Sequence, residues 1–525
     1  MSLNKNSPQG SAKKSPSASG AAPRQEEMEM LIGLLNSGQL GSAETEALRL
    51  LEQHRKSSAL HIILGTILSG QGKLEEAVSS YRQALKFEPR STQAHNNLGN
   101  ALRDLGKFEE AAASYRQALK INPQLAGVHN NLGNVLVALG KLEEAVASYQ
   151  HALKLKPDFA GVYINLGNIF QNLNKLDEAV ASFQRAIAIS PDIVQAHNNL
   201  GAALAAQGKC EEAVASYRQA LKLQPDHSQT HNNLGIALRN LGNLEEAYAS
   251  FQRSLEINPD NAGTLYNVHS LLLDSDDLSP AISCLETAVK LQPNNTEFRF
   301  FLGTLLDFVG DVKGADVHFK EVQQGSNLDR ARLDAWNYIK SANKTIPKMI
   351  GSKLEAFRLG MNAARNSGLV LEFGVRFGMT IRQIAGLVDQ EVHGFDSFEG
   401  LPEDWHNERK GSYTTNNAIP AVPSNVRLHK GWFEDTLPEF VKTHRDPVRF
   451  VNIDCDLYSA TKTVLDTLSS QIIPGTVIVF DEYMGNEHWR EDEFKAFQEA
   501  VRAYGWNYEY LAFSLFTKQV VVQIL

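Results

Sequence analysis

Hydrophobic and polar positions along the first three hundred residues repeat with a fixed step. Prolines recur every 34 residues, at Pro89, Pro123, Pro157, Pro191, Pro225, Pro259 and Pro293. Nine alanines keep the same spacing, from Ala43 to Ala315. One unit, AHNNLGNALRDLGKFEEAAASYRQALKINP, contains two stretches of helical spacing that are separated near Gly106. Each unit therefore predicts two helices, and a proline ends the second because it fixes φ and lacks an N–H donor.

The repeating unit resembles the tetratricopeptide repeat, which has the same length and the same Leu-Gly, Tyr, Ala and Pro positions. The resemblance covers residues 24–329 as nine units, of which the first and last are degenerate, as terminal caps often are. It implies helix pairs that stack into a superhelix with a concave inner face.

Six successive units carry an asparagine at one position of the first helix, which lines the concave face in this family. These residues are Asn97, Asn131, Asn165, Asn199, Asn233 and Asn267. The row resembles the asparagine ladder of the O-GlcNAc transferase superhelix. An amide both donates and accepts, so such a row can hold a peptide backbone without reading its side chains. We expect a protein or peptide partner in this groove; the alternative is that the amides bond neighbouring repeats and water.

The pattern changes after residue 325, and short apolar stretches then alternate with helical ones. The expected strands are 369–374, 391–396, 425–430, 448–454, 475–480, 506–513 and 518–525. Helical patterns between the first five predict parallel pairing, and the short link between the last two predicts a hairpin. The result is an α/β domain at 369–525 with a mostly parallel seven-stranded, Rossmann-like sheet. It resembles the class I S-adenosylmethionine (SAM) methyltransferase fold, with residues 330–368 as a helical linker or cap.

The first expected strand runs into Glu372-x-Gly374-x-x-x-Gly378, and the second ends at Asp396. Ligands of such sheets bind at the carboxyl ends of the strands. Glycines there let the backbone approach a ligand, and a carboxylate can accept hydrogen bonds from both ribose hydroxyls. This spacing suits SAM better than a dinucleotide. The alternatives are a tight turn for the glycines and a helix cap or exposed acid for Asp396.

Two groups of acids follow the fourth and fifth expected strands. Asp454 ends the fourth, and Asp481 and Glu482 end the fifth. These strands should be neighbours, so the acids should meet and repel one another unless they are protonated or bind a cation. Oxygen ligands at an open cleft favour Mg²⁺ or Mn²⁺. The alternative is that Asp454 contacts SAM and Asp481 caps a helix.

Several longer motifs, GFDSFEGLPEDW, GWFEDTLP, IDCDLYSATK and PGTVIVFDEY, resemble the macrocin O-methyltransferase family of sugar O-methyltransferases. The resemblance implies SAM as donor, a divalent metal and a hydroxyl acceptor. It implies Asp454 and Asp481 as metal ligands, with Glu482 at a position often filled by Asp. It also implies that Gly431 and Trp432 line the adenine site, although Trp432 could instead pack in the core.

Candidates for the general base are Asp454, His488 and Lys462. The connection 398–426 is long and contains glycine and proline, so we expect it to fold over the donor or to shape the acceptor site.

Composition narrows the classes of function. A chain of 525 residues needs more than one core. The net charge of -9 gives no overall basic balance for nucleic acid, and no apolar run reaches membrane-spanning length. The three cysteines lie far apart, which favours a reducing cytoplasm. Residues 1–23 lack the apolar centre of a signal peptide and are expected to be a disordered tail.

Together these features predict a cytoplasmic SAM-dependent O-methyltransferase, assisted by a divalent metal, that acts on a small-molecule or glycan hydroxyl. The repeats would recruit a protein partner or the acceptor. The alternative is a repeat adaptor or scaffold with a catalytically idle SAM-binding domain. A glycosyltransferase, suggested by the asparagine row alone, would need a longer catalytic region.

Overall fold

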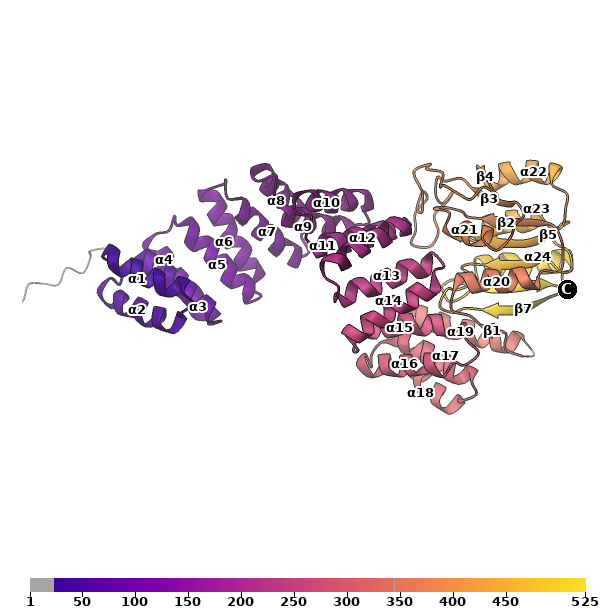
Figure 1. Cartoon of the computed structure of the whole chain (residues 1–525), viewed down its shortest axis with the longest axis horizontal. Coiled ribbons are helices and arrows are strands. Elements are labelled where there is room, and N and C mark those ends of the chain that lie inside the picture. The colour runs from indigo at the N-terminus through magenta and orange to yellow at the C-terminus, as the bar shows by residue number, and fades with distance from the viewer. Residues whose placement is uncertain (1–22, 344) are drawn as a thin grey trace, which may run out of the picture. The chain divides into compact units, whose positions relative to one another are not determined.

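The computed structural model describes residues 23–343 and 345–525. Apart from Pro23, the expected disordered tail lies outside the described residues. The chain divides into two compact units, Met1–Pro191 and Asp192–Leu525. Figure 1 labels the helices and strands of both units, which are taken in turn below.

The first unit contains five antiparallel helix pairs. They are α1 (Gln25–Asn36), α2 (Leu40–Gln53), α3 (Ser58–Gly70), α4 (Leu74–Phe87), α5 (Thr92–Asp104), α6 (Phe108–Ile121), α7 (Ala126–Ala138), α8 (Leu142–Leu155), α9 (Ala160–Asn172) and α10 (Leu176–Ile189). The Leu-Gly positions explain how closely the helices of a pair approach. A Cβ built on Gly99 would lie 2.6 Å from the ring of Tyr115, which is too close for any side chain. Glycine at this position therefore lets the tyrosine ring of the second helix pack on the first helix.

The second unit continues the array with four more pairs. They are α11 (Val194–Ala206), α12 (Cys210–Leu223), α13 (Ser228–Asn240), α14 (Leu244–Ile257), α15 (Ala262–Leu272), α16 (Ser279–Leu291), α17 (Thr296–Phe308) and α18 (Val312–Gln323). The nine predicted helix pairs are thus present in the described part of the chain. A further helix, α19 (Asn327–Ala342), follows the last pair.

The α/β part of the second unit is a single sheet with helices on both faces. Its strands are β1 (Lys348–Met349), β2 (Leu369–Phe373), β3 (Val392–Asp396), β4 (Val426–Lys430), β5 (Val448–Ile453), β6 (Val477–Phe480), β7 (Tyr508–Phe513) and β8 (Val520–Ile524). Its helices are α20 (Lys353–Ala363), α21 (Met379–Ala385), α22 (Phe433–Thr443), α23 (Tyr458–Thr467) and α24 (Glu493–Tyr504). Helices α20 and α21 pack on one face of the sheet, and α22, α23 and α24 pack on the other.

The strand order β1-β7-β8-β6-β5-β2-β3-β4 confirms the mostly parallel, Rossmann-like sheet. Strands β2, β5 and β6 are parallel neighbours, and β8 runs antiparallel to both β6 and β7, as the expected hairpin requires. The sheet has one strand more than predicted, because β1 pairs with the edge strand β7. Two residues are too short for a periodic signal, so the sequence pattern could not reveal this strand.

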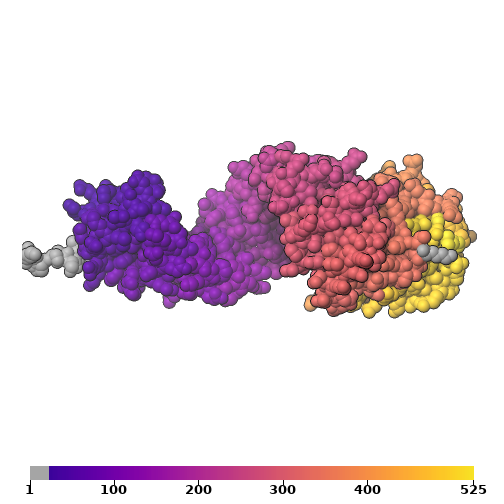
Figure 2. Space-filling model, turned by 90° about the horizontal axis from the view of Figure 1, so that it is seen from below, coloured from indigo at the N-terminus to yellow at the C-terminus, as the bar shows by residue number. Residues whose placement is uncertain are grey.

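The last repeats and the sheet share one hydrophobic core. The buried rings of Trp336 on α19 and Phe513 on β7 lie 5.8 Å apart, and Phe300 and Phe301 of α17 belong to the same cluster. Figure 2 shows these repeats and the C-terminal residues as one continuous surface. The segment 330–368, expected to be a helical linker or cap, contributes most of α19 to this core and β1 and α20 to the sheet.

The three cysteines are free thiols, and none forms a disulfide with another. Among the described residues, the structure contains no helix with the length and apolar character needed to cross a bilayer.

Candidate donor and acceptor site

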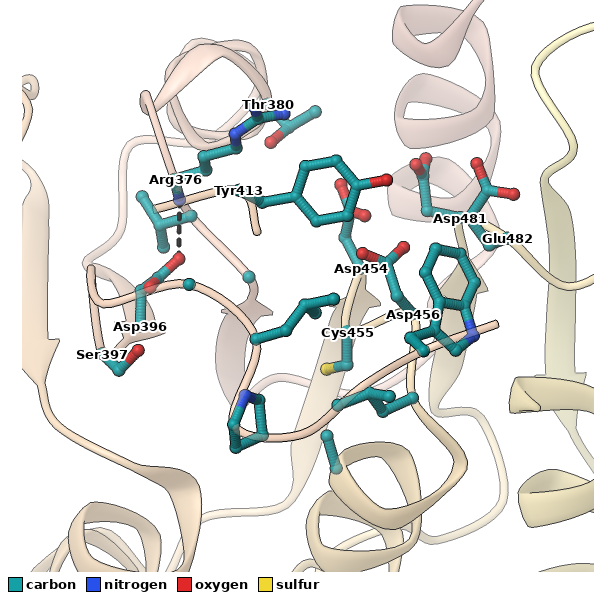
Figure 3. A pocket seen from close by; sticks show the side chains of 18 of the residues that line it. Arg376, Thr380, Asp396, Ser397, Tyr413, Asp454, Cys455, Asp456, Asp481 and Glu482 are labelled. Carbon is teal, nitrogen blue, oxygen red and sulfur yellow. Dashed lines mark hydrogen bonds between the residues drawn. The ribbon is translucent and has the colours of Figure 1, made fainter. Parts of the chain in front are cut away.

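A cavity of about 800 Å³ lies at the carboxyl ends of β2, β3, β5 and β6 (Figure 3). This is the edge of a parallel sheet at which ligands bind, and the volume is in the range of small-molecule sites. The loop after β2, the end of β3, the loop after β5 and the end of β6 all contribute lining residues. The predicted residues that line it are Gly374, Asp396, Trp432, Asp454, Asp481 and Glu482.

The loop after β2 is shaped by its two glycines. Gly374 has a φ of 92°, and a Cβ there would overlap the backbone carbonyl oxygen of Asp454 on the neighbouring chain segment. Gly378 has a φ of 75° and is the N-cap of α21. Both positions thus need glycine for backbone reasons, so the tight-turn interpretation is correct for Gly378, and Gly374 also borders the cavity.

Asp396 ends β3 and faces this loop. Its carboxylate accepts hydrogen bonds from the backbone amides of Arg376, at 2.7 Å, and Phe398, at 2.6 Å. Figure 3 shows the first of these bonds, beside the open cavity. Burial raises the pKa of Asp396, and the two amides oppose that shift. The acid therefore fixes the loop while its carboxylate still borders the cavity, as a residue that holds a ribose would.

Two carboxylates from the loop after β5 stand at the centre of the cavity. Asp454 follows the strand directly, and Asp456 has a left-handed φ of 62° that turns its side chain back toward Asp454 (Figure 3). Burial raises the pKa of Asp454 well above its usual value, and Asp481 adds to this rise. Burial also raises the pKa of Asp456 to about 7, with Glu482 adding. Neither carboxylate forms a side-chain hydrogen bond within the described residues, so both can meet a ligand.

The acids after β6 have lysine partners from distant parts of the chain. Asp481 accepts hydrogen bonds from Lys353 at 2.6 Å and from Gln519 at 2.7 Å. Glu482 pairs with Lys518 at 2.9 Å. Burial by itself would lower the pKa of Lys353, but Asp481 and Asp454 raise it, so this lysine stays charged.

Two of the three predicted metal ligands, Asp481 and Glu482, therefore already have cationic or amide partners. In the described parts of the chain, no three or more His, Cys, Asp or Glu side chains converge as a metal-binding group. Asp481 does not cap a helix, because the N-cap of the following helix, α24, is Asp492. The metal site remains a prediction.

Five predicted donor-site or base residues do not line the cavity, and one of them, Lys462, pairs instead with Asp466 at 3.1 Å. Glu372 is fully buried in the middle of β2, where it accepts a hydrogen bond from Asn452 at 3.1 Å, and burial raises its pKa to about 8. Gly378 begins α21, and Gly431 donates its amide to the carbonyl oxygen of Asp396 at 3.0 Å. His488 stacks on His406 with ring centroids 4.0 Å apart.

Sequence reasoning missed several lining residues, among them Lys353, Lys518, Arg376, Tyr413 and Asp456. Tyr413 belongs to the long connection 398–426, and the Arg376 guanidinium lies 4.9 Å from the centroid of its ring. That connection therefore contributes to the lining of the cavity, and its role toward the donor or the acceptor stays a prediction. Asp456 lies in the quoted motif IDCDLYSATK, so a second acid two residues after Asp454 was a signal that could have found it.

The asparagine row forms hydrogen bonds between successive repeats within each unit. In the first unit Asn131 donates to Asn100 at 3.3 Å and Asn165 donates to Asn134 at 3.0 Å. In the second unit Asn233 donates to Asn198 at 3.2 Å, and Asn267 donates to Asn232 at 3.0 Å. These four residues thus make the bonds between neighbouring repeats that the alternative interpretation names, while Asn97 and Asn199 each accept a bond from the adjacent asparagine. Peptide binding by the row stays a prediction.

The fold is that of a helical-repeat protein with a Rossmann-like domain, and comparison with known families gives the class. Residues 371–483 match a family described as a methyltransferase domain, and residues 228–261 match the tetratricopeptide repeat. Residues 35–234 match the C-terminal domain of cilia and flagella-associated protein 70. The chain is thus a tetratricopeptide-repeat protein with a C-terminal methyltransferase domain.

Two curated relatives are O-methyltransferases of Streptomyces. The 8-demethyl-8-(2,3-dimethoxy-alpha-L-rhamnosyl)-tetracenomycin-C 4'-O-methyltransferase of Streptomyces olivaceus is 35% identical over 107 residues, which cover 17% of this chain and 40% of the relative. The demethyldecarbamoylnovobiocin O-methyltransferase of Streptomyces niveus is 24% identical over 165 residues, which cover 28% of this chain and 60% of the relative. The chain therefore spans roughly half the length of these relatives.

Among solved structures, YrrB, whose published description is of a tetratricopeptide-repeat protein with an unusual peptide-binding site, is 23% identical to this chain. The similarity covers 36% of this chain and 98% of YrrB, with a TM-score of 0.33.

Proposed function

We propose that the protein is a SAM-dependent O-methyltransferase that acts on a hydroxyl of a small molecule or glycan. The single observation that carries this proposal is the meeting of Asp396 with the glycine loop at one end of the cavity and of Asp454 and Asp456 at its centre. The methyltransferase family and the O-methyltransferases of Streptomyces support the same class of reaction.

The donor end of the cavity suits the nucleoside of SAM. Asp396 would accept hydrogen bonds from the ribose hydroxyls, and Trp432, which lines the cavity from the start of α22, would cover the adenine. Gly374 packs closely against the backbone carbonyl group of Asp454, so the loop that borders the donor end lies next to the acids after β5. When bound, SAM supplies an activated methyl group, so the residues of the chain need only align the acceptor and remove its proton.

Removal of the proton from the acceptor hydroxyl is assigned to the pair Asp454 and Asp456. Two acids that face each other in a partly buried site do not both ionise easily, so they share protons as a pair. The ionised member can accept the proton of the acceptor hydroxyl, at the centre of the cavity. His488 is a weaker candidate because it lies outside the lining and stacks on His406.

A divalent ion, which the family resemblance implies, would have to compete for its ligands. It would need to displace Lys353 from Asp481 and Lys518 from Glu482. In the arrangement seen here these two ammonium groups balance the charge of the acids after β6. We therefore propose a reaction in which the chain itself supplies the cations.

The repeats would recruit a protein partner or the acceptor. Repeats of this class commonly bind peptides, and the side-chain amides of the asparagine row can both donate and accept hydrogen bonds. We further propose a cytoplasmic location, which three free cysteines suit, and cell fractionation would test it.

Two measurements test the proposed function. Isothermal titration should detect SAM binding to the wild-type chain, and isotopically labelled SAM should transfer its methyl group to a member of a panel of glycans and hydroxylated small molecules. Asp456→Asn keeps the shape of the side chain, and asparagine tolerates the left-handed backbone at this position. We expect it to bind SAM normally and to lower kcat by about 10²-fold or more.

The adaptor alternative predicts a different result. SAM would bind, but no acceptor in the panel would be methylated, and Asp456→Asn would change nothing. A wild-type chain with no measurable affinity for SAM would contradict both functions.

A further inference from the structure

One wall of the cavity comes from the repeats. Ala205, Ala206 and Gly208, at the turn between α11 and α12, line it together with the loop that follows β2. All of these residues belong to the second unit, Asp192–Leu525. The repeats in this unit are therefore part of the site.

The closest approach is between Gly208 and Phe377. Gly208 has a φ of 73°, like the glycines at the equivalent turns of other repeats, such as Gly106 and Gly140. A Cβ built on Gly106 or Gly140 would meet nothing within 4 Å, whereas a Cβ on Gly208 would overlap the ring of Phe377. The ring of Phe377, which belongs to the loop 374–378 after β2 (the donor loop), thus lies directly on the backbone of this one turn.

Residues next to this contact also connect the repeats to α21. The Sγ atom of Cys210 lies 3.4 Å from the Sδ atom of Met379, the first residue of α21. One turn later, the Nε2 atom of Gln383 donates to the carbonyl oxygen of Asn240 at 2.8 Å. The start of α12 and the end of α13 therefore fix α21, the helix that the donor loop enters.

The position of Phe377 affects the hydrogen bond between the Arg376 amide and Asp396 in the donor site. Phe377 follows Arg376, whose backbone amide donates to Asp396, the residue assigned to the ribose. Because Arg376 also has a left-handed φ of 48°, this short loop has little freedom to absorb a shift of the next residue. A displaced ring would therefore pull the amide away from Asp396.

We propose that the repeat turn 205–208 is a positioning element of the donor site, which holds Phe377 and thereby keeps the loop 374–378 in the conformation that binds SAM. This inference rests on the proposed function in taking SAM as the ligand. It gives the repeats a second role, separate from any partner in their groove: they complete the pocket of the domain that follows them.

The test compares two glycine substitutions with the same turn geometry in the full-length chain. Gly208→Ala and Gly140→Ala place the same methyl group at a turn glycine with φ near 70°, so the backbone strain is matched. Only the first meets Phe377. Since misplacement of a site by about 1 Å can cost up to 10²-fold, we expect Gly208→Ala to bind SAM about tenfold more weakly and Gly140→Ala to bind like the wild type. Equal affinities of the two variants would overturn the inference.

Removal of the ring separates positioning from general damage. In a Phe377→Ala background the added methyl group at residue 208 has no ring to displace. We therefore expect Gly208→Ala to cause no further loss there, so the two substitutions should be strongly non-additive. A tenfold loss from Gly208→Ala in both backgrounds would mean that it acts by unfolding the repeats, which contradicts the proposal.

A measurement without ligand separates this inference from the proposed function. Hydrogen exchange of the free protein, followed by mass spectrometry of a peptide that covers 374–378, reports the Arg376 amide directly. We expect faster exchange in Gly208→Ala than in Gly140→Ala. If the wild type fails to bind SAM but this difference is present, the proposed function is wrong and the positioning role is supported. If exchange is unchanged in both variants, the positioning role is wrong.

Discussion

The assignment of Asp396 to the donor ribose makes the sharpest prediction. Asp396→Ala removes a carboxylate that would accept hydrogen bonds from two ribose hydroxyls. Hydrogen bonds to a charged group contribute roughly 1.5–3 kcal/mol each, so loss of both should cost about 3 kcal/mol or more. That corresponds to about 10²-fold weaker binding of SAM, which isothermal titration can measure.

The structure complicates the interpretation of this variant, because Asp396 also holds two backbone amides of the loop. A change on the ligand side removes the ambiguity. A 2′-deoxy analogue of SAM should bind about tenfold more weakly than SAM to the wild type, through loss of one hydrogen bond to the carboxylate. Asp396→Ala should bind SAM and the analogue equally, because the acid that distinguishes them is gone.

A matched control comes from Asp389, an exposed acid just before β3 that does not line the cavity. Asp389→Ala should bind SAM and the analogue with wild-type affinities. If Asp396→Ala still prefers SAM over the deoxy analogue by the wild-type factor, the ribose is held elsewhere, and the donor would have to lie differently in the cavity.

Four further predictions concern stability, charge and access. Burial lowers the pKa of His269 to about 3 and that of His393 to about 4. Because the unfolded value is about 6.5, the stability that these two histidines contribute is full above that pH and is lost as the pH falls toward their folded values, by about 4 kcal/mol for the two together at pH 5. Glu372 and Asp456, whose pKa values are raised, act in the opposite direction, so the test compares variants: a His269→Asn, His393→Asn double variant should lose less stability than the wild type between pH 7 and pH 5, and an equal shift of the urea midpoint in both would contradict this. Gly99→Ala should destabilise the repeats by about 1–3 kcal/mol in urea denaturation because its Cβ meets a tyrosine ring, whereas Gly127→Ala, with open space around its Cβ, should be neutral or stabilising. Methyl transfer should survive EDTA because lysines already pair with the acids after β6, and activity that is lost with EDTA and restored by Mg²⁺ would reinstate the metal. Limited proteolysis should cut the connection 398–426 more slowly when SAM is present, and equal rates would argue against a closing loop.

Local patterns predicted the repeats and the central strands closely. The 34-residue step placed nine helix pairs, because each pair is fixed by its own glycine, alanine and proline positions. The expected strand 448–454 is observed as β5 (Val448–Ile453), and 391–396 as β3 (Val392–Asp396). The pairing of β2 with β5 followed from connection rules for parallel sheets, and it brought Asp454 next to the glycine loop as expected.

The features of the site that the sequence did not predict have a common cause. The sequence contains no pattern that predicts the pairing of Lys353 with Asp481 and of Lys518 with Glu482, since salt bridges between residues far apart in the chain leave no periodic signal. It also could not tell that Glu372, although part of the glycine motif, would be enclosed within β2. Side chains on one strand alternate between faces, and only the packed sheet decides which of them borders a cavity.

The sequence by itself determined the two kinds of architecture and the residue types at the strand ends, because helix pairs and βα units are specified by local spacing. Only the tertiary structure decided that the second part of the repeat array shares a core with the sheet and that Gly208 lies under Phe377. These contacts join residues more than a hundred positions apart, and their geometry depends on how whole elements dock. Short motifs therefore determine which residue types the site contains, whereas the packing of whole elements determines its walls and its charge balance.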